Sequence, residues 1–244
     1  MTKKYAVLGD IHANLDALQT VLADAKEQGV TDYICVGDVV GYNAYPNECC
    51  EIIRELGAVT VRGNHDHYCA FEEPLDDFHP MAAAVVEWSR RELTEDNKAW
   101  LRSLEYIRKE RGITIVHATL DMPERWGYVF ESIEAEPSFP YQKTQLCFHG
   151  HTHVPVVFEQ QQGNVTAIQA PGEIKLALGR KYFLNTGSVG QPRDQIPDAS
   201  YCIYDADAKT VTYRRLPYDI EKACAAIRAA GLPDRLAERL TVGR

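Results

Sequence analysis

The sequence lacks the features that mark membrane-spanning, secreted and nucleic-acid-binding chains. No segment of its 244 residues approaches the run of about eighteen apolar residues that a membrane span needs. The N-terminus enters a strand-like run at once, without the apolar stretch and cleavage site of a signal peptide. No run of Lys or Arg reaches four residues, and a net charge of −9 repels phosphate backbones. We therefore expect neither a membrane nor a long nucleic acid as partner.

Disulfide and metal motifs built on Cys-x-x-Cys pairs are also missing. The seven cysteines are an odd number. Cys35 and Cys147 lie in apolar strand-like runs, where buried thiols are the usual outcome, and Cys49 and Cys50 lie in a helical pattern. We expect reduced cysteines and a cytoplasmic location.

The hydrophobic fraction of 45% is sufficient for a full core, and the first half of the chain alternates strands and helices. This alternation predicts stacked βα units with a buried, largely parallel sheet. The expected strands cover 5–8, 33–36, 59–61, 113–116 and 146–148, and the expected helices cover 14–28 and 46–56.

Residues 67–110 interrupt this alternation, and we interpret them as an inserted helical cap within a single domain, 1–244. An acidic, irregular stretch at 71–80 precedes two helices at 81–93 and 95–104, with Thr94 as N-cap. Later strands look antiparallel, and a helix is expected at 218–230. Those strands are 154–158, 165–169, 182–185, 201–204 and 211–215, the last two joined by a hairpin turn at 205–209. The pattern predicts an α/β sandwich of two sheets.

Five segments place metal-binding side chains directly after predicted strands, where ligands bind in open α/β sheets. The candidate ligands are Asp10, His12, Asp38, Asn64, His117, His151 and His153. Asp10 and His12 are two residues apart, and in extended backbone their side chains would point to the same side. Asp38 has two carboxylate oxygens and can bridge two metals. Mixed imidazole and oxygen ligands favour Mn, Fe, Zn, Co or Ni over Ca or Mg.

In their order along the chain, these segments resemble the calcineurin-like metallophosphoesterase superfamily. Its signature blocks are DxH, GDxx, GNH(D/E), H and GHxH, and all five occur between residues 5 and 153. The segment 185–193 is also similar to one in small bacterial phosphodiesterase-like members. The resemblance implies a four-layer αββα sandwich with a dimetal site, Mn being the expected metal. Asp10, His12, Asp38 and His153 would hold one metal, and Asp38, Asn64, His117 and His151 the other.

The resemblance also implies hydrolysis of a phosphate ester. Two metals lower the pKa of a shared water, so that a metal-bridging hydroxide attacks phosphorus. In the family, the histidine at the position of His65 is a general acid that protonates the leaving oxygen. Asp66 would either orient His65 or cap a helix.

The expected substrate is a small phosphodiester or nucleotide-type ester, and the oligomeric state stays open. Gly37–Tyr42 lacks the Asp-Arg-Gly continuation of phosphoprotein phosphatases, which disfavours the alternative of a Ser/Thr protein phosphatase. A second alternative, a non-catalytic scaffold, should have lost ligands or the general acid, and none is lost. Asn14, Arg62 and Arg193 are candidate phosphate contacts. Residues 41–43 and 126–128 could stack on a nucleobase or pack in the core.

Overall fold

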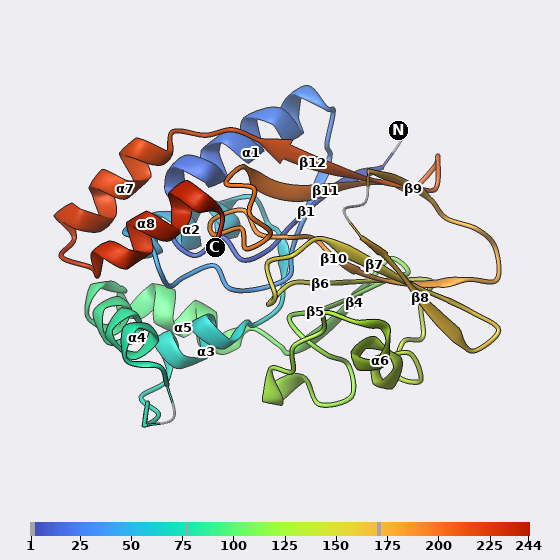
Figure 1. Cartoon of the computed structure of the whole chain (residues 1–244), viewed down its shortest axis with the longest axis horizontal. Helices are drawn as coiled ribbons and strands as arrows, with labels where there is room; N and C mark the ends of the chain where they lie inside the picture. Colours follow the sequence, from blue (N-terminus) through green and yellow to red (C-terminus); the bar gives the residue numbers. More distant parts are fainter. Residues whose placement is uncertain (1–2, 77, 170–171) are drawn as a thin grey trace.

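Two six-stranded mixed sheets pack face to face in the computed structural model, which describes residues 3–76, 78–169 and 172–244 (Figure 1). The acidic segment 71–80 is thus described except at Asp77, and Met1 and Thr2 lie outside the described residues. The first sheet has the strand order β3 (Val59–Thr60), β2 (Asp32–Cys35), β1 (Lys4–Leu8), β11 (Ala199–Asp205), β12 (Thr210–Leu216), β9 (Glu173–Lys175). The second has the order β4 (Ile107–Glu110), β5 (Ile113–Val116), β6 (Leu146–His149), β10 (Lys181–Asn185), β7 (Val156–Gln161), β8 (Asn164–Gln169).

The alternation of side chains along β1 shows how the sequence fills two cores. Tyr5 and Val7 point between the two sheets, where they join residues of the second sheet such as Phe148. Ala6 and Leu8 point to the outer face, where they join the core beneath the first two helices. Because both faces are buried, this strand appears in the sequence as a continuous apolar run.

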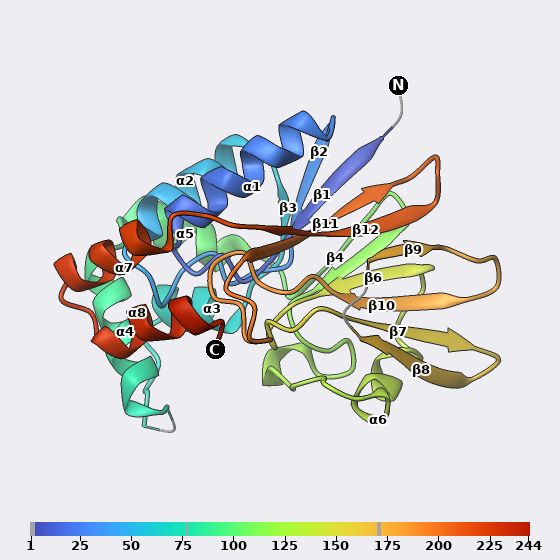
Figure 2. The ribbon, with the colours of Figure 1, turned by 45° about the horizontal axis from the view of Figure 1, so that its top comes forward.

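The outer layers differ in thickness. The helices α1 (Leu15–Glu27) and α2 (Pro46–Glu55) pack on the outer face of the first sheet (Figure 2). The outer face of the second sheet is covered by the segment 118–142, whose only α-helix is the four-residue α6 (Ser132–Ala135), flanked by the 3₁₀ turns η1 (Pro123–Arg125) and η2 (Glu136–Ser138). The predicted four-layer α/β sandwich is confirmed, with the fourth layer built mainly from loops.

Five further helices lie together on one side of the sandwich (Figure 1). They are α3 (Asn64–Ala70), α4 (Pro80–Glu92), α5 (Glu95–Ser103), α7 (Ile220–Ala229) and α8 (Asp234–Val242). The helices α4 and α5 contact α2 and α3, and the Thr94 side chain accepts a hydrogen bond from the Asn97 N–H as the predicted cap. Residues 107–110, which we expected in the helical insertion, instead form β4 and pair antiparallel with β5.

The strand at 181–185 also departs from the expected antiparallel pattern. β10 lies inside the second sheet, parallel to β6 and antiparallel to β7. Its carboxyl end is therefore beside the end of β6, so that Asn185 pairs in register with His149. The hairpin at 205–209 is confirmed, and the Asp205 carboxylate accepts hydrogen bonds from the N–H groups of Asp207 and Ala208.

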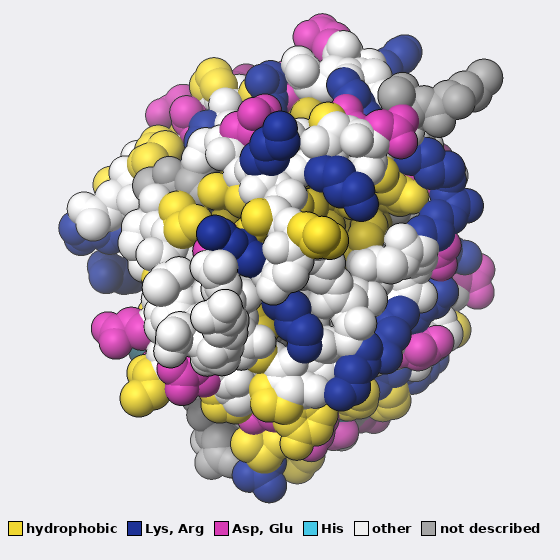
Figure 3. Space-filling model, turned by 90° about the vertical axis from the view of Figure 1, so that its right-hand side faces the viewer, with side chains coloured by type: hydrophobic (Ala, Val, Ile, Leu, Met, Phe, Trp, Pro, Cys, Tyr) yellow, Lys and Arg dark blue, Asp and Glu magenta, His cyan; other side chains and the backbone are white. Residues whose placement is uncertain are grey.

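One end of the sandwich carries basic and hydrophobic side chains. Figure 3 shows the end away from the five helices, where Lys and Arg side chains border a group of hydrophobic side chains. Of the helices that the structure describes, none combines the length and apolar character that crossing a bilayer requires.

Candidate metal centre

The predicted ligands come from both sheets and meet where the parallel strands end. The first sheet supplies those that follow β1, β2 and β3, and the second supplies those that follow β5 and β6. Six of the seven side chains are buried and Asn64 is half-buried: Asp10, His12, Asp38, His117, His151 and His153 are each at most 6% exposed. The strand ends thus gather residues that are up to 143 positions apart, from 10 to 153.

Five of the seven candidate ligands have a left-handed backbone conformation, so the extended geometry expected for Asp10 and His12 is wrong. Their φ angles are 50° and 49°, and Asp38, His151 and His153 also have positive φ, at 55°, 70° and 63°. The His12 N–H donates to the Asp38 carbonyl at 2.9 Å, which joins two of the loops. Such backbone costs about 1–3 kcal/mol per residue and is concentrated at functional sites.

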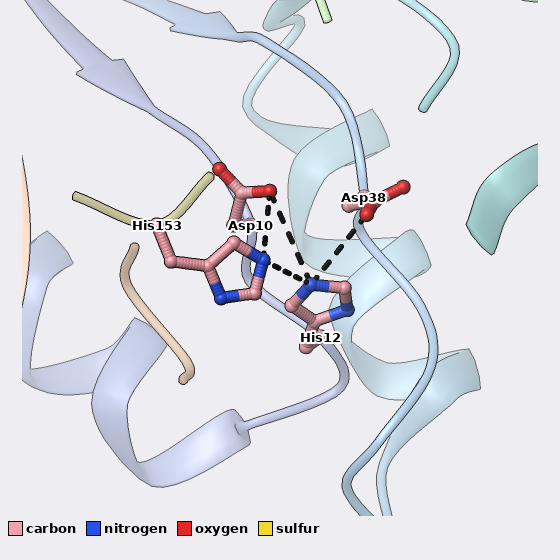
Figure 4. Close-up of side chains that lie close together, drawn as sticks. All are labelled: Asp10, His12, Asp38 and His153. Atoms are coloured by element: carbon pink, nitrogen blue, oxygen red, sulfur yellow. Dashed lines mark hydrogen bonds and ion pairs between the residues drawn. The ribbon is translucent and has the colours of Figure 1, made fainter. Parts of the chain in front are cut away.

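Four side chains form the first ligand group (Figure 4). The Nε2 atoms of His12 and His153 are 3.1 Å apart, and each also faces a carboxylate. His12 Nε2 lies 3.5 Å from Asp38 Oδ2, and His153 Nε2 lies 3.2 Å from Asp10 Oδ1. All four donor atoms lie within 4.8 Å of one another. This is the group that the resemblance assigned to one metal.

Asp38 also belongs to the second group, with His117 and His151. Its Oδ2 atom lies 3.4 Å from His117 Nε2, which makes this oxygen common to both groups. The Asn64 Oδ1 atom completes the second group, at 3.1 Å from His117 Nε2 and 3.0 Å from His151 Nδ1. Two buried clusters that share one carboxylate are consistent with a binuclear metal site.

The orientation of the imidazoles fits this role. His12, His117 and His153 each place Nδ1 within 2.6–2.9 Å of a backbone carbonyl oxygen, of Val40, Val36 and Gln191 respectively. A carbonyl only accepts, so Nδ1 carries a proton in each ring, and in the neutral ring Nε2 directs its lone pair toward the cluster. The buried Nε2 atom of His151 has no hydrogen-bond partner among the described residues. The residues present therefore fit divalent cations with mixed nitrogen and oxygen ligands.

The charges of the cluster are strongly coupled. Burial opposes ionisation of Asp38, but His117, His65 and His12 together hold the pKa of its carboxyl well below the usual range. Burial likewise opposes protonation of His117, yet the Asp38 carboxylate raises the pKa of His117 to about 9. Asp38 is thus held in its ionised form beside these imidazoles.

His65 lies beside the ligands without joining either group. Its ring packs against Tyr42 and His12, with centroids 4.4 and 4.9 Å apart, and its buried Nδ1 has no hydrogen-bond partner among the described residues. Burial lowers the pKa of His65 to about 4, although Asp38 raises it. Gly41 has φ +95°, and a Cβ there would lie 2.5 Å from His65 Nδ1.

The sequence left open whether Asp66 orients His65 or caps a helix, and the structure shows its hydrogen bonds. Its carboxylate accepts hydrogen bonds from the N–H groups of Asp38 and Val39, each at 2.8 Å, and from Gly63 at 3.0 Å. The bond from Gly63 caps α3, as one alternative proposed, and the other two fix the loop that carries Asp38. Burial, followed by the charge of Asp38, raises the pKa of Asp66 to about 7.

Two of the three candidate phosphate contacts are engaged in the fold. The Asn14 side chain caps α1 and donates to the Gly190 carbonyl and the Tyr218 hydroxyl. The Arg62 guanidinium donates to the carbonyls of Arg102 and Leu104, at 2.6 and 2.5 Å. The buried Arg62 Nε has no hydrogen-bond partner among the described residues.

The third candidate, Arg193, lies beside the metal ligands. Its charge contributes to the lowered pKa of His153, after burial as the larger cause. It belongs to the segment 185–193, which supports the site in other ways. Asn185 donates to the Gly150 carbonyl at 2.6 Å, and the Ser188 hydroxyl donates to the Asp10 carbonyl at 2.7 Å. The sequence indicated this segment only through resemblance, because none of its side chains is a metal ligand.

A cavity of about 260 Å³ opens onto Asn64, His65 and His151. Its walls are mostly aromatic and comprise Tyr42, Tyr68, Phe78, Trp126 and Tyr128, with Ala82. The Tyr128 ring lies 4.3 Å from that of His151, and Tyr128 is 55% exposed, which excludes the core-packing alternative for this side chain.

The other histidines lie outside both groups. His149 is buried and stacks on Phe183 with ring centroids 3.9 Å apart. His67 pairs with Glu73 at 3.1 Å, and His79 caps α4.

Known proteins resemble this chain in both sequence and structure. The calcineurin-like phosphoesterase superfamily domain matches residues 4–209. The uncharacterized protein MJ0912 of Methanocaldococcus jannaschii is 41% identical over 243 residues, covering 98% of each chain. A crystal structure of a metallophosphoesterase from Sphaerobacter thermophilus superimposes with a TM-score of 0.90 at 37% identity and full coverage of both chains. The hypothetical protein PH1004 of Pyrococcus horikoshii OT3 has the same fold, with a TM-score of 0.80 at 20% identity over 99% of this chain and 98% of that one. The chain belongs to the calcineurin-like phosphoesterase superfamily.

Proposed function

We propose that this protein hydrolyses a small phosphodiester or nucleotide-type phosphate ester with the help of two divalent cations, Mn²⁺ being the expected metal. The observation that carries the proposal is the shared Asp38 oxygen between two buried ligand groups. Asp10, His12, Asp38 and His153 would hold one cation, and Asp38, Asn64, His117 and His151 the other. Such a pair of cations supplies a nucleophile at neutral pH and neutralises phosphoryl charge.

The chain itself would position the ester and supply a proton. His65 lines the cavity next to Asn64; because its Nδ1 is buried against Gly41, the ring would direct its Nε2 toward a leaving oxygen. A phosphate anion bound beside the ring would favour the imidazolium form and raise the pKa of His65, which would oppose the lowering by burial. The aromatic walls of the cavity suit a nucleobase or aryl group on the ester, which supports a nucleotide-type substrate.

The proposal is tested by Mn²⁺-dependent turnover of bis-p-nitrophenyl phosphate. We expect His65→Ala to lower kcat by about 10²–10⁴-fold, the usual contribution of a general acid, while two metal ions per chain remain bound. His67→Gln is the matched control, because His67 lies on the same helix and pairs with Glu73. It should keep kcat within about threefold.

Two outcomes would contradict the proposal. The absence of metal-dependent turnover on any aryl or nucleotide ester would favour the scaffold alternative. Binding of a protein partner by the metal-free chain would then support that alternative. Faster release of phosphate from phosphoserine peptides than from nucleotides would favour a protein phosphatase. Both alternatives are therefore decided by the same substrate panel.

A further inference from the structure

Tyr42 lies between the metal centre and a second, larger cavity. The residue is buried, and its ring centroid lies 4.4 Å from that of His65 and 4.6 Å from that of His12. Tyr42 lines the cavity that opens onto His65, and it also lines a neighbouring cavity of about 710 Å³. This side chain is therefore in direct contact with the proposed general acid and with one metal ligand.

The His65 ring has no hydrogen bond at Nδ1 that could fix its orientation. That atom is buried and has no partner among the described residues. The Asp66 carboxylate, which is next in the chain, accepts hydrogen bonds from backbone N–H groups instead, and none of its hydrogen bonds involves His65. A side chain without such bonds keeps one rotamer only where its neighbours exclude the others. The orientation of His65 therefore depends on packing.

Gly41 and Tyr42 supply this packing from a single loop. A Cβ at Gly41 would lie 2.5 Å from His65 Nδ1, so this edge of the imidazole lies against the backbone. The Tyr42 ring packs on the imidazole with the ring planes inclined by 53°, an arrangement that aromatic pairs favour over face-to-face stacking. With Nδ1 against Gly41, Nε2 is the nitrogen that can face the substrate.

The position of Tyr42 is itself closely determined. Its φ angle of 60° is left-handed, a conformation that costs free energy in a bulky residue and is concentrated at functional sites. The Cζ atoms of Arg193 and Arg239 lie 5.6 and 6.0 Å from the centroid of its ring, within the range of cation–π contacts. The next residue, Asn43, donates through its side chain to the His12 carbonyl at 2.8 Å, which fixes the loop to the metal centre.

We propose, on the basis of the hydrolysis proposed above, that Tyr42 is a positioning residue for His65, whose imidazole it holds with Nε2 toward the leaving oxygen. In that step the proton on Nε2 passes to the leaving oxygen as the bond between this oxygen and phosphorus breaks. The aromatic ring of Tyr42 is sufficient for the role, because its contact with His65 is between the two rings. A displacement of about 1 Å at a reacting group can lower a rate about 100-fold.

A double-mutant cycle tests this role, with hydrolysis of bis-p-nitrophenyl phosphate by the Mn²⁺-loaded full chain as the readout. We expect Tyr42→Leu to lower kcat about 10–100-fold and to keep KM within about threefold, with two metal ions per chain still bound. In a His65→Ala chain, the same substitution should lower kcat by less than about twofold, because no imidazole remains to be positioned. Tyr42→Phe keeps the ring and should retain kcat within about threefold of the wild type.

Tyr45→Leu is the matched control. Tyr45 belongs to the same loop, at the N-cap of α2, and lines neither of the two cavities. This substitution also replaces a tyrosine ring by a leucine, but it should leave kcat unchanged in the wild-type and in the His65→Ala chain.

The outcomes separate the role of Tyr42 from the proposed hydrolysis. Equal losses of kcat for Tyr42→Leu in the wild-type and His65→Ala chains would overturn the positioning role and leave hydrolysis through His65 in place. Loss of bound metal in Tyr42→Leu would overturn it in favour of an effect on His12, and a Tyr42→Phe variant as slow as Tyr42→Leu would overturn it in favour of the hydroxyl. An undiminished kcat in His65→Ala would overturn the general acid and the positioning role together. If Tyr42→Leu does not fold by circular dichroism, Tyr42→Met takes its place in the cycle.

Discussion

At the scale of single residues, two glycines that carry no reactive group make room for His65 and for Asp38. Gly41 lies against His65 Nδ1, and Gly63 lies so close to Asp38 that a Cβ would overlap its carboxylate. The glycine before Asn64 is therefore required by the close approach of its backbone to Asp38, and the one at 41 by its contact with His65. The sequence shows the glycine but not the neighbour that requires it.

Gly41→Ala tests this close packing. The substitution adds a Cβ 2.5 Å from His65 Nδ1 at a φ of +95°, and we expect it to lower kcat at least about tenfold and stability by about 1–3 kcal/mol. Gly57→Ala is the control, since Gly57 has φ +61° but no atom within 4 Å of the added Cβ. Gly57→Ala should lower stability without lowering kcat. Equal kcat values for the two variants, measured with bis-p-nitrophenyl phosphate, would contradict the prediction.

Asp66→Asn tests the support of the bridging ligand. The carboxylate accepts from the N–H groups of Asp38, Val39 and Gly63, whereas an amide would turn an NH₂ group toward some of these donors. We expect metal affinity to fall about 10–100-fold, as for other residues that hold a metal ligand in place. Metal titration with a competing chelator measures the affinity. The exposed Asp96→Asn should bind as the wild type does, and an Asp66→Asn affinity equal to it would contradict this role.

At the scale of elements, sequence patterns located strands and helices that have a strong apolar period and missed those that do not. β1, β2 and β5 have buried apolar runs, and α1 has a regular apolar face. β4 is an edge strand whose sequence, Ile-Arg-Lys-Glu, has no apolar run, and it forms because β5 pairs with it. Among the described strands, the three residues of β9 likewise pair only with β12. Tertiary pairing made these strands, so local pattern could not reveal them.

At other positions the sequence indicated only part of what the structure shows. Leu236 and Leu240 in α8 are four residues apart, which is helical spacing, although our expectation ended at residue 230. The ligand list followed from motif spacing, but the left-handed loops did not, because positive φ at Asp and His is uncommon. The approach of both Arg193 and Arg239 to the Tyr42 ring could not be foreseen, since 46 positions separate the two and only the packed helix α8 brings Arg239 there.

One ion pair joins α1 to the neighbouring strands and predicts a pH dependence of stability. Burial opposes ionisation of Asp24, but hydrogen bonds from Arg214 and Tyr201 lower the pKa of its carboxyl below 3.8. A depressed folded-state pKa contributes stability above the unfolded pKa, and this contribution is lost as pH falls through the folded value. We expect Asp24→Asn to cost about 1–2 kcal/mol at pH 7.

The difference in free energy of unfolding between wild type and Asp24→Asn should be constant from pH 7 to pH 5. It should become smaller as the pH falls below 3.8. Urea unfolding at each pH measures it. Asp234→Asn, which removes an exposed pair with Arg228, serves as the control and should change stability little. If the stability difference between wild type and Asp24→Asn instead increased as the pH fell, the predicted direction of the pH dependence would be wrong.

At the scale of the whole molecule, the metal centre joins the two sheets. Asp10, Asp38 and Asn64 extend from the first sheet, and His117, His151 and His153 from the second. Bound cations would therefore link two layers that otherwise meet through the hydrophobic core between them. We expect binding to stabilise the entire fold because the ligands are together only in the folded chain.

Chelation should accordingly lower the melting temperature of the Mn²⁺-loaded protein. At a free metal concentration of 100 Kd, each site contributes about 2.7 kcal/mol, a shift of several degrees in differential scanning calorimetry. Asp38→Asn weakens both ligand groups, so its melting temperature should respond much less to Mn²⁺. An equal shift in wild type and variant would indicate that the cations bind elsewhere.

The single Asp38 oxygen between the two groups has a consequence for how the centre fills. A cation on either side draws the same carboxylate into position for the other and at the same time withdraws electron density from it. The two occupancies are therefore thermodynamically linked, and by reciprocity each ion changes the affinity of the other by the same factor. Titration of this protein with Mn²⁺ should give two unequal, interdependent steps, and loss of Asp38 should leave two weak and independent ones.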